Sequence, residues 1–363
     1  MHLIYYFVYI FAKINLKRNN FFTSVWRMVM RKTALDILKF ISAILIVTIH
    51  IMFPGNLGVF FKAFSRFAVP VFFMVSGYFS YNAIENRNYL KLRNRIVKLL
   101  KIYIPSAILY FVVELLIRDR SIWFDYIKES ICLSSLIKLI LFNKPLFNTP
   151  LWFLLALIYC YLLIMLLLKF NKLKVMEVLT PILLVVSILF FDIILGVINI
   201  EISQLIVRNF LLMGMPFVCI GYFLKMNENR LSGINNLALL STLILGFAVF
   251  IIEYLFLYNM SELYFGSSII AVSLFILCIR DNRQQKSNKF FAYISDASLT
   301  IYIVHSPLSN VCNKLIDKTG MNRTVAFEYI YPIVIILLSI IISFFIYVVK
   351  SHINVNKNKS KAI

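Results

Sequence analysis

Ten largely apolar stretches, separated by short polar connections, dominate the hydrophobic pattern of the chain. Each stretch is 16 to 23 residues long, and roughly 20 residues in a helix are needed to cross a bilayer. The pattern therefore predicts an all-α fold, a polytopic membrane helix bundle with about ten transmembrane helices. The expected spans are 35–53, 64–82, 96–117, 151–168, 177–199, 204–224, 235–257, 264–279, 292–312 and 327–349.

Composition agrees with a membrane protein. Of the 363 residues, 61% are hydrophobic, whereas a soluble domain is roughly 45–50% apolar. No internal repeat or Gly/Ser-rich linker interrupts the chain, so we expect one membrane domain over residues 31–350. Residues 351–363 form a basic tail. Residues 1–30 are a less defined extension, which either forms an interfacial helix or precedes a natural start at Met28 or Met30.

The distribution of basic residues predicts the orientation. They are concentrated before the first span, in the connections after spans two, four, six and eight, and in the tail. Cytoplasmic loops carry an excess of Lys and Arg, so we expect a multi-pass protein of the cell membrane with both termini cytoplasmic. The net charge of +21 does not indicate a nucleic-acid partner, because the basic residues lie between apolar runs. They are expected to meet anionic membrane lipid or an anionic cytosolic ligand.

The five cysteines are scattered, without a CxxC or a Cys/His ligand spacing. This usage predicts small packing residues and no metal site or disulfide framework.

The first span carries three ionisable residues in the segment LDILKFISAILIVTIH, residues 35–50. Asp36 and Lys39 are three residues apart and share a helix face, and the eleven further residues to His50 return to the same face. Lys39 and His50 are then about 16 Å apart along the helix axis. Lipid would penalise such a stripe, so we expect it to face protein or water. The alternative is an interfacial Asp–Lys pair and an unrelated histidine at the helix end.

The second span reads RFAVPVFFMVSGYF, residues 66–79. Arg66 begins this span directly after the loop that follows His50, so the two should lie at similar depth. Pro70 is expected to break the hydrogen-bond ladder of the helix, and Ser76-Gly77 offers a small surface for close helix approach. Alternatively, Arg66 only extends towards lipid head groups.

Further ionisable residues fall in the outer parts of later spans. Glu114, Asp192, Arg208, Glu253 and His305 together indicate a polar cavity that opens outward. Each of them alone is more typical of a buried ion pair or a helix end.

A second group of charges lies on the expected cytoplasmic side, where Arg93, Arg95, Lys98 and Lys101 surround the start of the third span. They suit an anionic ligand such as a nucleotide, although the positive-inside rule alone accounts for many of them.

Five segments together resemble the acyltransferase 3 family of integral membrane acyltransferases. In chain order they are LDILKFISAILIVTIH, RFAVPVFFMVSGYF, KLRNRIVKLLKIYIP, PLWFLLALIYCY and ISDASLTIYIVHSPL, spread over about residues 33–310. The family pattern of an acidic residue, a basic residue and a histidine in the first span is filled by Asp36, Lys39 and His50. The basic position is usually arginine, so Lys39 is a departure that loses the planar two-point grip.

The resemblance also assigns positions in later spans. The arginine of the second span corresponds to Arg66, the Phe-Phe pair to Phe72-Phe73, and the Ser-Gly pair to Ser76-Gly77. The Tyr-x-x-His of the ninth span corresponds to Tyr302 and His305.

The resemblance implies an O-acyltransferase that moves an acyl group, acetyl in the expected case, from cytosolic acyl-CoA to a hydroxyl of an extracytoplasmic or lipid-linked carbohydrate. Acyl-CoA is then a donor substrate, and no bound cofactor or metal is expected. The predicted catalytic residues are His50, Arg66 and His305, with His50 acting either as a general base or through a transient acyl-histidine. Asp36, Lys39, Arg93 and Arg95 are predicted to bind the donor, and Ser76, Tyr302, Glu114 and Arg208 the acceptor.

Two other classes remain open from the sequence. A carrier or flippase for a lipid-linked saccharide would use the same polar intramembrane residues for passage, and a membrane scaffold or sensor is the third reading. The chain ends shortly after the tenth span, so we expect transfer to be completed within the spans or with a separate partner.

Overall fold

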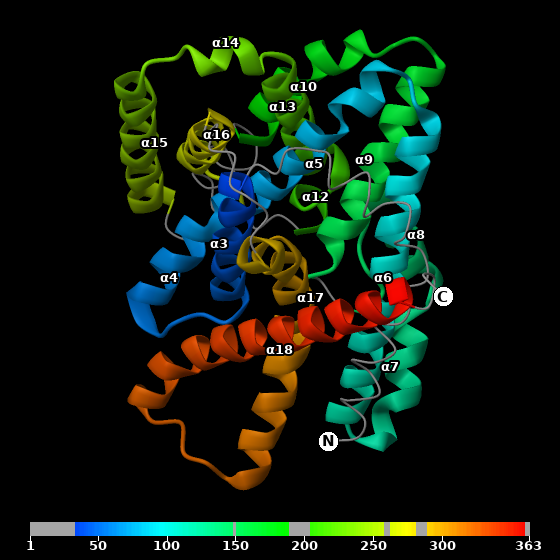
Figure 1. The fold of residues 1–363 in the computed structure, drawn as a ribbon. Coiled ribbons are helices and arrows are strands. Elements are labelled where there is room, and N and C mark those ends of the chain that lie inside the picture. Colours follow the sequence, from blue (N-terminus) through cyan, green and yellow to red (C-terminus); the bar gives the residue numbers. More distant parts are fainter. Residues whose placement is uncertain (1–32, 148–149, 189–203, 258–261, 281–288, 360–363) are drawn as a thin grey trace.

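The structure, a computed structural model, describes residues 33–147, 150–188, 204–257, 262–280 and 289–359. Within these ranges the chain forms helices and no strand, which confirms the all-α prediction. Most of the long helices run side by side along the bundle (Figure 1). The top of the bundle in Figure 1 is the end predicted to be cytoplasmic. It holds the turn between α5 and α6, the turn between α9 and α10, and α14 (Glu228–Ser232).

The first two predicted spans are connected by a helix that the sequence pattern did not suggest. Helix α3 (Thr33–His50) ends three residues earlier than expected, and α4 (Gly55–Phe64) replaces the predicted loop 54–63. The chain turns at Gly55, whose φ is +62°, and Gly58 packs so closely that a Cβ there would lie 1.7 Å from the Phe53 carbonyl oxygen. The apolar sequence of α4 then allows a helix that runs into the 3-10 turn η1 (Ser65–Phe67) and α5 (Ala68–Glu85).

Helix α5 packs directly against α13 (Met215–Met226) through glycines on both helices. A Cβ added at Gly77 would lie 1.8 Å from the Val218 carbonyl oxygen, and one at Gly221 would lie 2.0 Å from that of Met74. The close approach predicted at Ser76-Gly77 is therefore present. The predicted break in the hydrogen-bond ladder at Pro70 coincides with the 3-10 turn η1, which separates α4 from α5, and α5 begins two residues before Pro70. Pro70 has no N–H to bond the carbonyl of Arg66.

The long connection 118–150 is also largely helical. After α6 (Tyr89–Ile117) come η2 (Arg120–Ile122), α7 (Trp123–Ser130) and α8 (Leu133–Phe142), and then α9 (Trp152–Lys169) and α10 (Lys174–Ile188). Asn143 ends α8 in the left-handed conformation, with a φ of +49°, which asparagine tolerates better than most residues.

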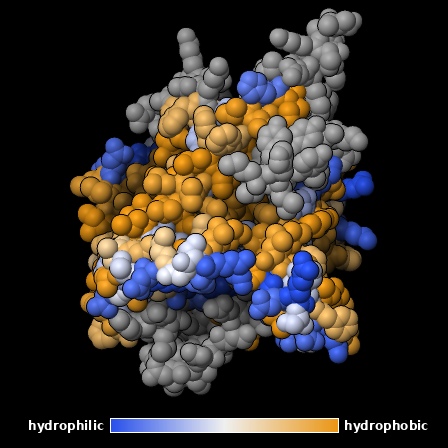
Figure 2. All heavy atoms as spheres, turned by 90° about the horizontal axis from the view of Figure 1, so that it is seen from below, coloured by the Kyte–Doolittle hydropathy of each residue, from blue (hydrophilic) through white to orange (hydrophobic). Residues whose placement is uncertain are grey.

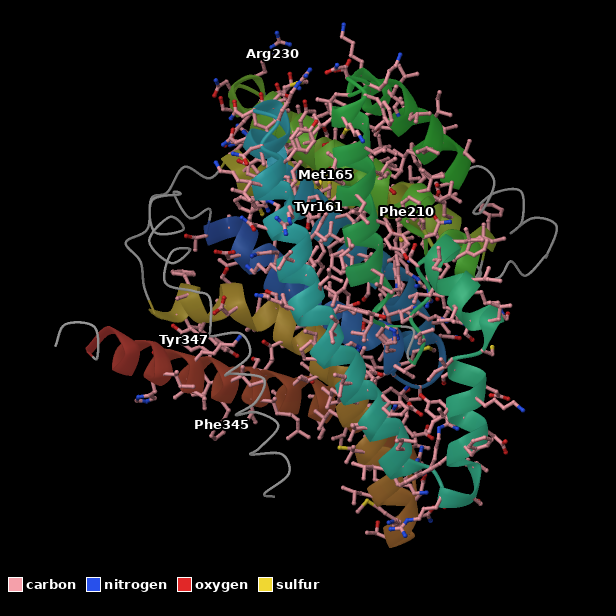
Figure 3. The ribbon with its side chains drawn as sticks, turned by 90° about the vertical axis from the view of Figure 1, so that its right-hand side faces the viewer. Tyr161, Met165, Phe210, Arg230, Phe345 and Tyr347 are labelled. Carbon is pink, nitrogen blue, oxygen red and sulfur yellow. The ribbon has the colours of Figure 1, made fainter. Side chains whose placement is uncertain are left out.

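The predicted continuous span 204–224 is wrong in one respect, because the helix is interrupted. Helix α12 (Gln204–Val207) stops before Arg208, and a π-helical turn, η4 (Phe210–Gly214), leads into α13. Irregular backbone at membrane depth is tolerated where it is buried in protein or lines a cavity. Phe210, labelled in Figure 3, packs here against Tyr159 of α9, with ring centroids 5.4 Å apart.

Helices α15 (Asn236–Leu257) and α16 (Phe265–Arg280) form the next pair. The carboxylate of Glu253 accepts hydrogen bonds from the backbone N–H groups of Phe265 (3.0 Å) and Gly266 (2.9 Å), and so caps α16. A carboxylate at a helix N-terminus satisfies free donors and the helix dipole. The expectation that Glu253 lines a polar cavity is therefore replaced by a structural role.

Helix α17 (Lys289–Thr319) continues through Pro307, so most of the predicted outer loop 313–326 is helical. Helix α18 (Val325–Lys359) has the length and hydropathy of a membrane span. In Figure 1, however, it runs across the view, whereas α6 and α9 run up and down it. Tyr293 of α17 lies 2.9 Å from Ser343 of α18, hydroxyl to hydroxyl, at this crossing.

Among the described residues, six helical segments are long and apolar enough to cross a membrane: 33–50, 55–85, 89–117, 152–169, 236–256 and 325–353. Shorter apolar helices cover 133–142, 210–226 and 265–280. Hydrophobic side chains cover most of the coloured surface in Figure 2, and hydrophilic residues gather in separate patches. These features agree with a multi-pass membrane protein. Asp192 and the extension 1–30 lie outside the described residues.

Candidate active site

His50 and Arg66, the two residues predicted to act together, are held at one end of the bundle by a hydrogen bond between their supporting segments. The hydroxyls of Thr48 and Ser65 are buried and lie 2.9 Å apart. Thr48 is two residues before His50, and Ser65 directly precedes Arg66. This contact ties the end of α3 to η1 and fixes the depth of both functional side chains.

Arg66 takes part in a bridge of two arginines on one carboxylate. It donates to both oxygens of Glu262, at 2.7 Å and 3.1 Å. Arg208 donates to the same two oxygens at 2.9 Å and 2.8 Å. Burial alone raises the pKa of Glu262, but the charges of Arg66 and Arg208 outweigh burial and hold this pKa below its ordinary value. Glu262 is therefore an ionised anchor that sets the spacing of the two guanidinium groups.

The interruption between α12 and η4 places Arg208 in this bridge. The side chain of Asn143 donates to the Arg208 carbonyl oxygen (3.2 Å) and accepts from the N–H of Phe210 (2.8 Å). The side-chain oxygen of Asn209 accepts from the N–H groups of Leu211 and Leu212, both at 2.8 Å. Two asparagines thus satisfy the backbone groups that the missing helical turn leaves free.

A pocket that is partly open to the outside lies against this bridge. Its polar lining consists of His50, Arg66, Arg208, Glu262 and Tyr302. Aromatic side chains form much of the remaining wall, namely Phe72, Trp152 and Phe153. A mostly apolar cavity with a few convergent polar groups is typical of a small-molecule site.

His305 lies next to His50 but does not line the pocket. Their ring centroids are 5.2 Å apart, and His305 is completely buried. Its Nδ1 lies 3.1 Å from the Ile301 carbonyl oxygen, and its Nε2 has no hydrogen-bond partner in the described part of the chain. His305 is therefore placed to position His50 rather than to touch a ligand.

Tyr302, one helical turn before His305, does line the pocket. Its hydroxyl donates to the carbonyl oxygen of Pro150, which is also part of the lining. This bond ties α17 to the segment leading into α9.

Two residues predicted to bind the acceptor lie elsewhere. The Ser76 hydroxyl donates to the Phe72 carbonyl oxygen of its own helix at 2.9 Å. Glu114 is bound by Arg118 at 3.1 Å and by the side chain of Asn310 at 3.1 Å. Neither residue lines the pocket. Both side chains are used in contacts within and between helices.

The residues predicted to bind the donor lie towards the other end of α3. Asp36 and Lys39 form the predicted ion pair at 2.6 Å, and the Ser295 hydroxyl donates to Asp36 at 3.0 Å. Arg95 donates to the Phe79 carbonyl oxygen, and Arg93 is exposed. The pocket includes Ile46 of α3 but not Lys39, so its lining does not extend to this group.

Glu262 is the residue that the sequence did not single out. It lies in a connection without basic residues, far along the chain from both of its arginine partners. The sequence did contain a signal for Glu262, because it is the single carboxylate of a short outer connection. Arg66 and Arg208, both predicted near the outer side, require such a counter-charge.

A family model described as an acyltransferase domain, Acyl_transf_3, matches residues 32–349. The chain belongs to the acyltransferase 3 family. No curated protein and no solved structure matches it. The protein is therefore a membrane acyltransferase.

The fold of this acyltransferase brings together segments that are far apart in sequence. Four of the five segments that carry the family resemblance contribute to the pocket, through His50, Arg66, Trp152 and Tyr302. The fifth, which carries Arg93 and Arg95, lies at the other end of the bundle, because α6 starts at the α5–α6 turn. Arg208 and Glu262 belong to none of the five segments.

Proposed function

We propose that the protein is an O-acyltransferase that moves an acyl group, acetyl in the simplest case, from cytosolic acyl-CoA to a hydroxyl of an extracytoplasmic or lipid-linked carbohydrate. The observation that carries this proposal is the position of His50 in a pocket beside two arginines and aromatic walls. A neutral imidazole is the side chain best suited to take a hydroxyl proton near neutral pH. Aromatic faces and cationic donors suit a sugar ring with polar substituents.

The reaction that this arrangement supports begins with the acceptor hydroxyl against His50. One imidazole nitrogen takes the hydroxyl proton while the oxygen attacks the thioester carbonyl carbon. The new C–O bond forms, the C–S bond then breaks, and the imidazolium returns the proton to the CoA thiolate. Transfer through an acyl-histidine uses the same residue in two steps, and acid-quenched protein carrying a labelled acyl group would distinguish this route from direct transfer.

Arg66 has two roles available to it in this scheme. Its guanidinium is fixed by Glu262, so it can stabilise the negative charge that develops on the carbonyl oxygen without reorganising. It can also orient the acceptor, together with Arg208, which is held by the same carboxylate.

The donor is proposed to enter from the end of the bundle where Asp36 and Lys39 pair. The ion pair holds Lys39 near the start of α3. Lys39, Arg95 and Lys350 all lie within electrostatic range of Lys98, with Asp296 as the acidic residue among them. This collection of positive charge suits the phosphates of CoA. The pantetheine arm would then have to pass along α3 to bring the thioester to His50.

The decisive experiment measures acyl transfer from acetyl-CoA in membranes that contain equal amounts of wild-type or His50→Ala protein. Loss of transfer in His50→Ala, with full transfer in the exposed-histidine control His352→Ala, is the expected result. Transfer at a near-normal rate by His50→Ala would remove His50 from the mechanism. Movement of an unmodified glycan without any acyl product would instead favour a carrier.

A further inference from the structure

The arginine pair beside His50 carries more positive charge than the described acidic residues around it balance. Arg66 and Arg208 carry two positive charges, and Glu262, the carboxylate that they share, carries one negative charge. Glu262 is the one acidic side chain among the described residues that line the pocket. Lys62 of α4 adds a further positive charge within electrostatic range of all three. Among the described residues, one positive charge, or two with Lys62, is left without an acidic partner at this end of the pocket.

The unused hydrogen-bond donors belong to the same two residues. A guanidinium has five N–H donors, and Arg66 and Arg208 each direct two bonds to Glu262. In the part of the chain that the structure describes, the Nε of Arg66 is buried without a partner. The side chain of Arg66 is only 8% exposed and that of Arg208 only 14%, so water compensates little of this charge.

An uncompensated charge in a largely apolar enclosure is costly unless a ligand supplies the opposite charge. Planar guanidinium groups bind carboxylate and phosphate through paired charge-assisted hydrogen bonds. Both arginines lie in the pocket lining together with His50, so an anionic group bound there would lie close to the reacting hydroxyl.

We infer that the acceptor is anionic, a carbohydrate whose carboxylate or phosphate group binds to Arg66 and Arg208 beside the hydroxyl that is acylated. This inference rests on the proposed acyltransferase function and specifies its acceptor class. Glu262 holds the two guanidinium groups at a fixed spacing and leaves their remaining donors for the ligand. Trp152 and the neighbouring aromatic side chains form the wall against which the sugar ring packs.

The phosphates of acyl-CoA are the other anionic groups that could bind Arg66 and Arg208. Lys39 and Arg95 lie towards the opposite end of α3 from His50, and neither lines the pocket. The donor phosphates therefore have their own basic region, and the arginine pair is assigned to the acceptor.

The test uses purified full-length protein in detergent, at constant ionic strength, titrated with D-glucuronate, D-glucose 6-phosphate and D-glucose. At least one of the two anionic sugars is expected to bind about tenfold or more tightly than glucose, since hydrogen bonds to charged groups are the stronger kind. Arg208→Gln should lose this preference, whereas Arg230→Gln, an exposed arginine at the far end of the bundle in Figure 3, should keep it. No preference in the wild type, or an unchanged preference in Arg208→Gln, overturns the inference.

Wild-type protein alone separates the two sources of the anion, so the result does not depend on the folding of a variant. The anionic sugar should leave the affinity for acetyl-CoA unchanged if the arginines bind the acceptor. Competition between the sugar and acetyl-CoA would assign the site to the donor and overturn the inference. Equal acylation of glucose and glucuronate would refute the anionic acceptor while the acyltransferase remains, whereas no acyl product and no acetyl-CoA binding would refute the proposed function itself.

Discussion

His50 and His305 form a histidine pair in which only one member reaches the pocket. Their ring centroids lie 5.2 Å apart, and His305 is completely buried behind its contact with the Ile301 carbonyl oxygen. An Nδ1–H donated to this carbonyl would leave Nε2 as an acceptor without a partner among the described residues. The second histidine therefore acts on the first through packing of the two rings, because neither of its ring nitrogens bonds His50 in the described part of the chain.

This relationship predicts the behaviour of His305→Asn. The turnover number should fall by up to about a hundredfold, because a small displacement of a reacting group has effects of this size. The KM for acetyl-CoA should stay the same, and the pH dependence of kcat should move, since the surroundings of His50 change. The exposed-histidine variant His352→Asn is the control. A fall in the amount of folded protein, with unaltered kcat and pH profile, would indicate a purely structural residue.

Glu262→Gln should destabilise the protein by roughly 3–5 kcal/mol, because it leaves two buried arginine charges facing each other. The lowered pKa of Glu262 adds a pH dependence. A carboxylate whose pKa is lowered by folding stabilises the folded protein fully when the pH is above its ordinary pKa of 4.5. This contribution to the free energy of unfolding is lost as the pH falls through the folded-state pKa. The difference in melting temperature between wild type and Glu262→Gln should therefore be constant near neutrality and shrink in acid. A difference that grew in acid would contradict the bridge.

Asn143→Ala tests the support of the interrupted helix. The side chain of Asn143 is fully buried and bonds the Arg208 carbonyl and the Phe210 N–H. Leaving these two groups unsatisfied should cost about 1–3 kcal/mol each, and acyl transfer should fall because Arg208 moves. Asn86→Ala removes an exposed asparagine and should change neither property. Melting temperature and transfer rate measured on the same samples provide the comparison, and normal transfer would show that Arg208 is held by other contacts.

The glycine contacts between α5 and α13 give a prediction about stability alone. Gly77→Ala and Gly221→Ala each place a Cβ within 2.0 Å of a backbone oxygen of the facing helix. The helices must then separate, which should cost at least about 1–3 kcal/mol. Gly233→Ala is the matched control, since its Cβ would meet an atom only at 3.6 Å. Thermal unfolding in detergent measures the effect, and equal melting temperatures for Gly77→Ala and Gly233→Ala would show that the interface is looser than described.

The sequence by itself determined the helical membrane class and the family, and it singled out His50, Arg66, Tyr302 and Arg208, which all line the pocket. Apolar length and periodicity are local properties, so ten predicted spans each coincide at least in part with a helix. The shared face of Asp36 and Lys39 follows from helix geometry in the same way, and the ion pair is present.

Only the tertiary structure decided which polar residues meet. Glu114 and Glu253 carried the same signal as Arg208, and Ser76 was also predicted to bind the acceptor. The side chains of all three serve contacts within and between helices instead. Glu262 reaches Arg66 across 196 residues of chain, and the interruption at Arg208 depends on Asn143, 65 residues earlier. Counter-charges and backbone partners at such distances are set by how helices pack, which no local periodicity encodes.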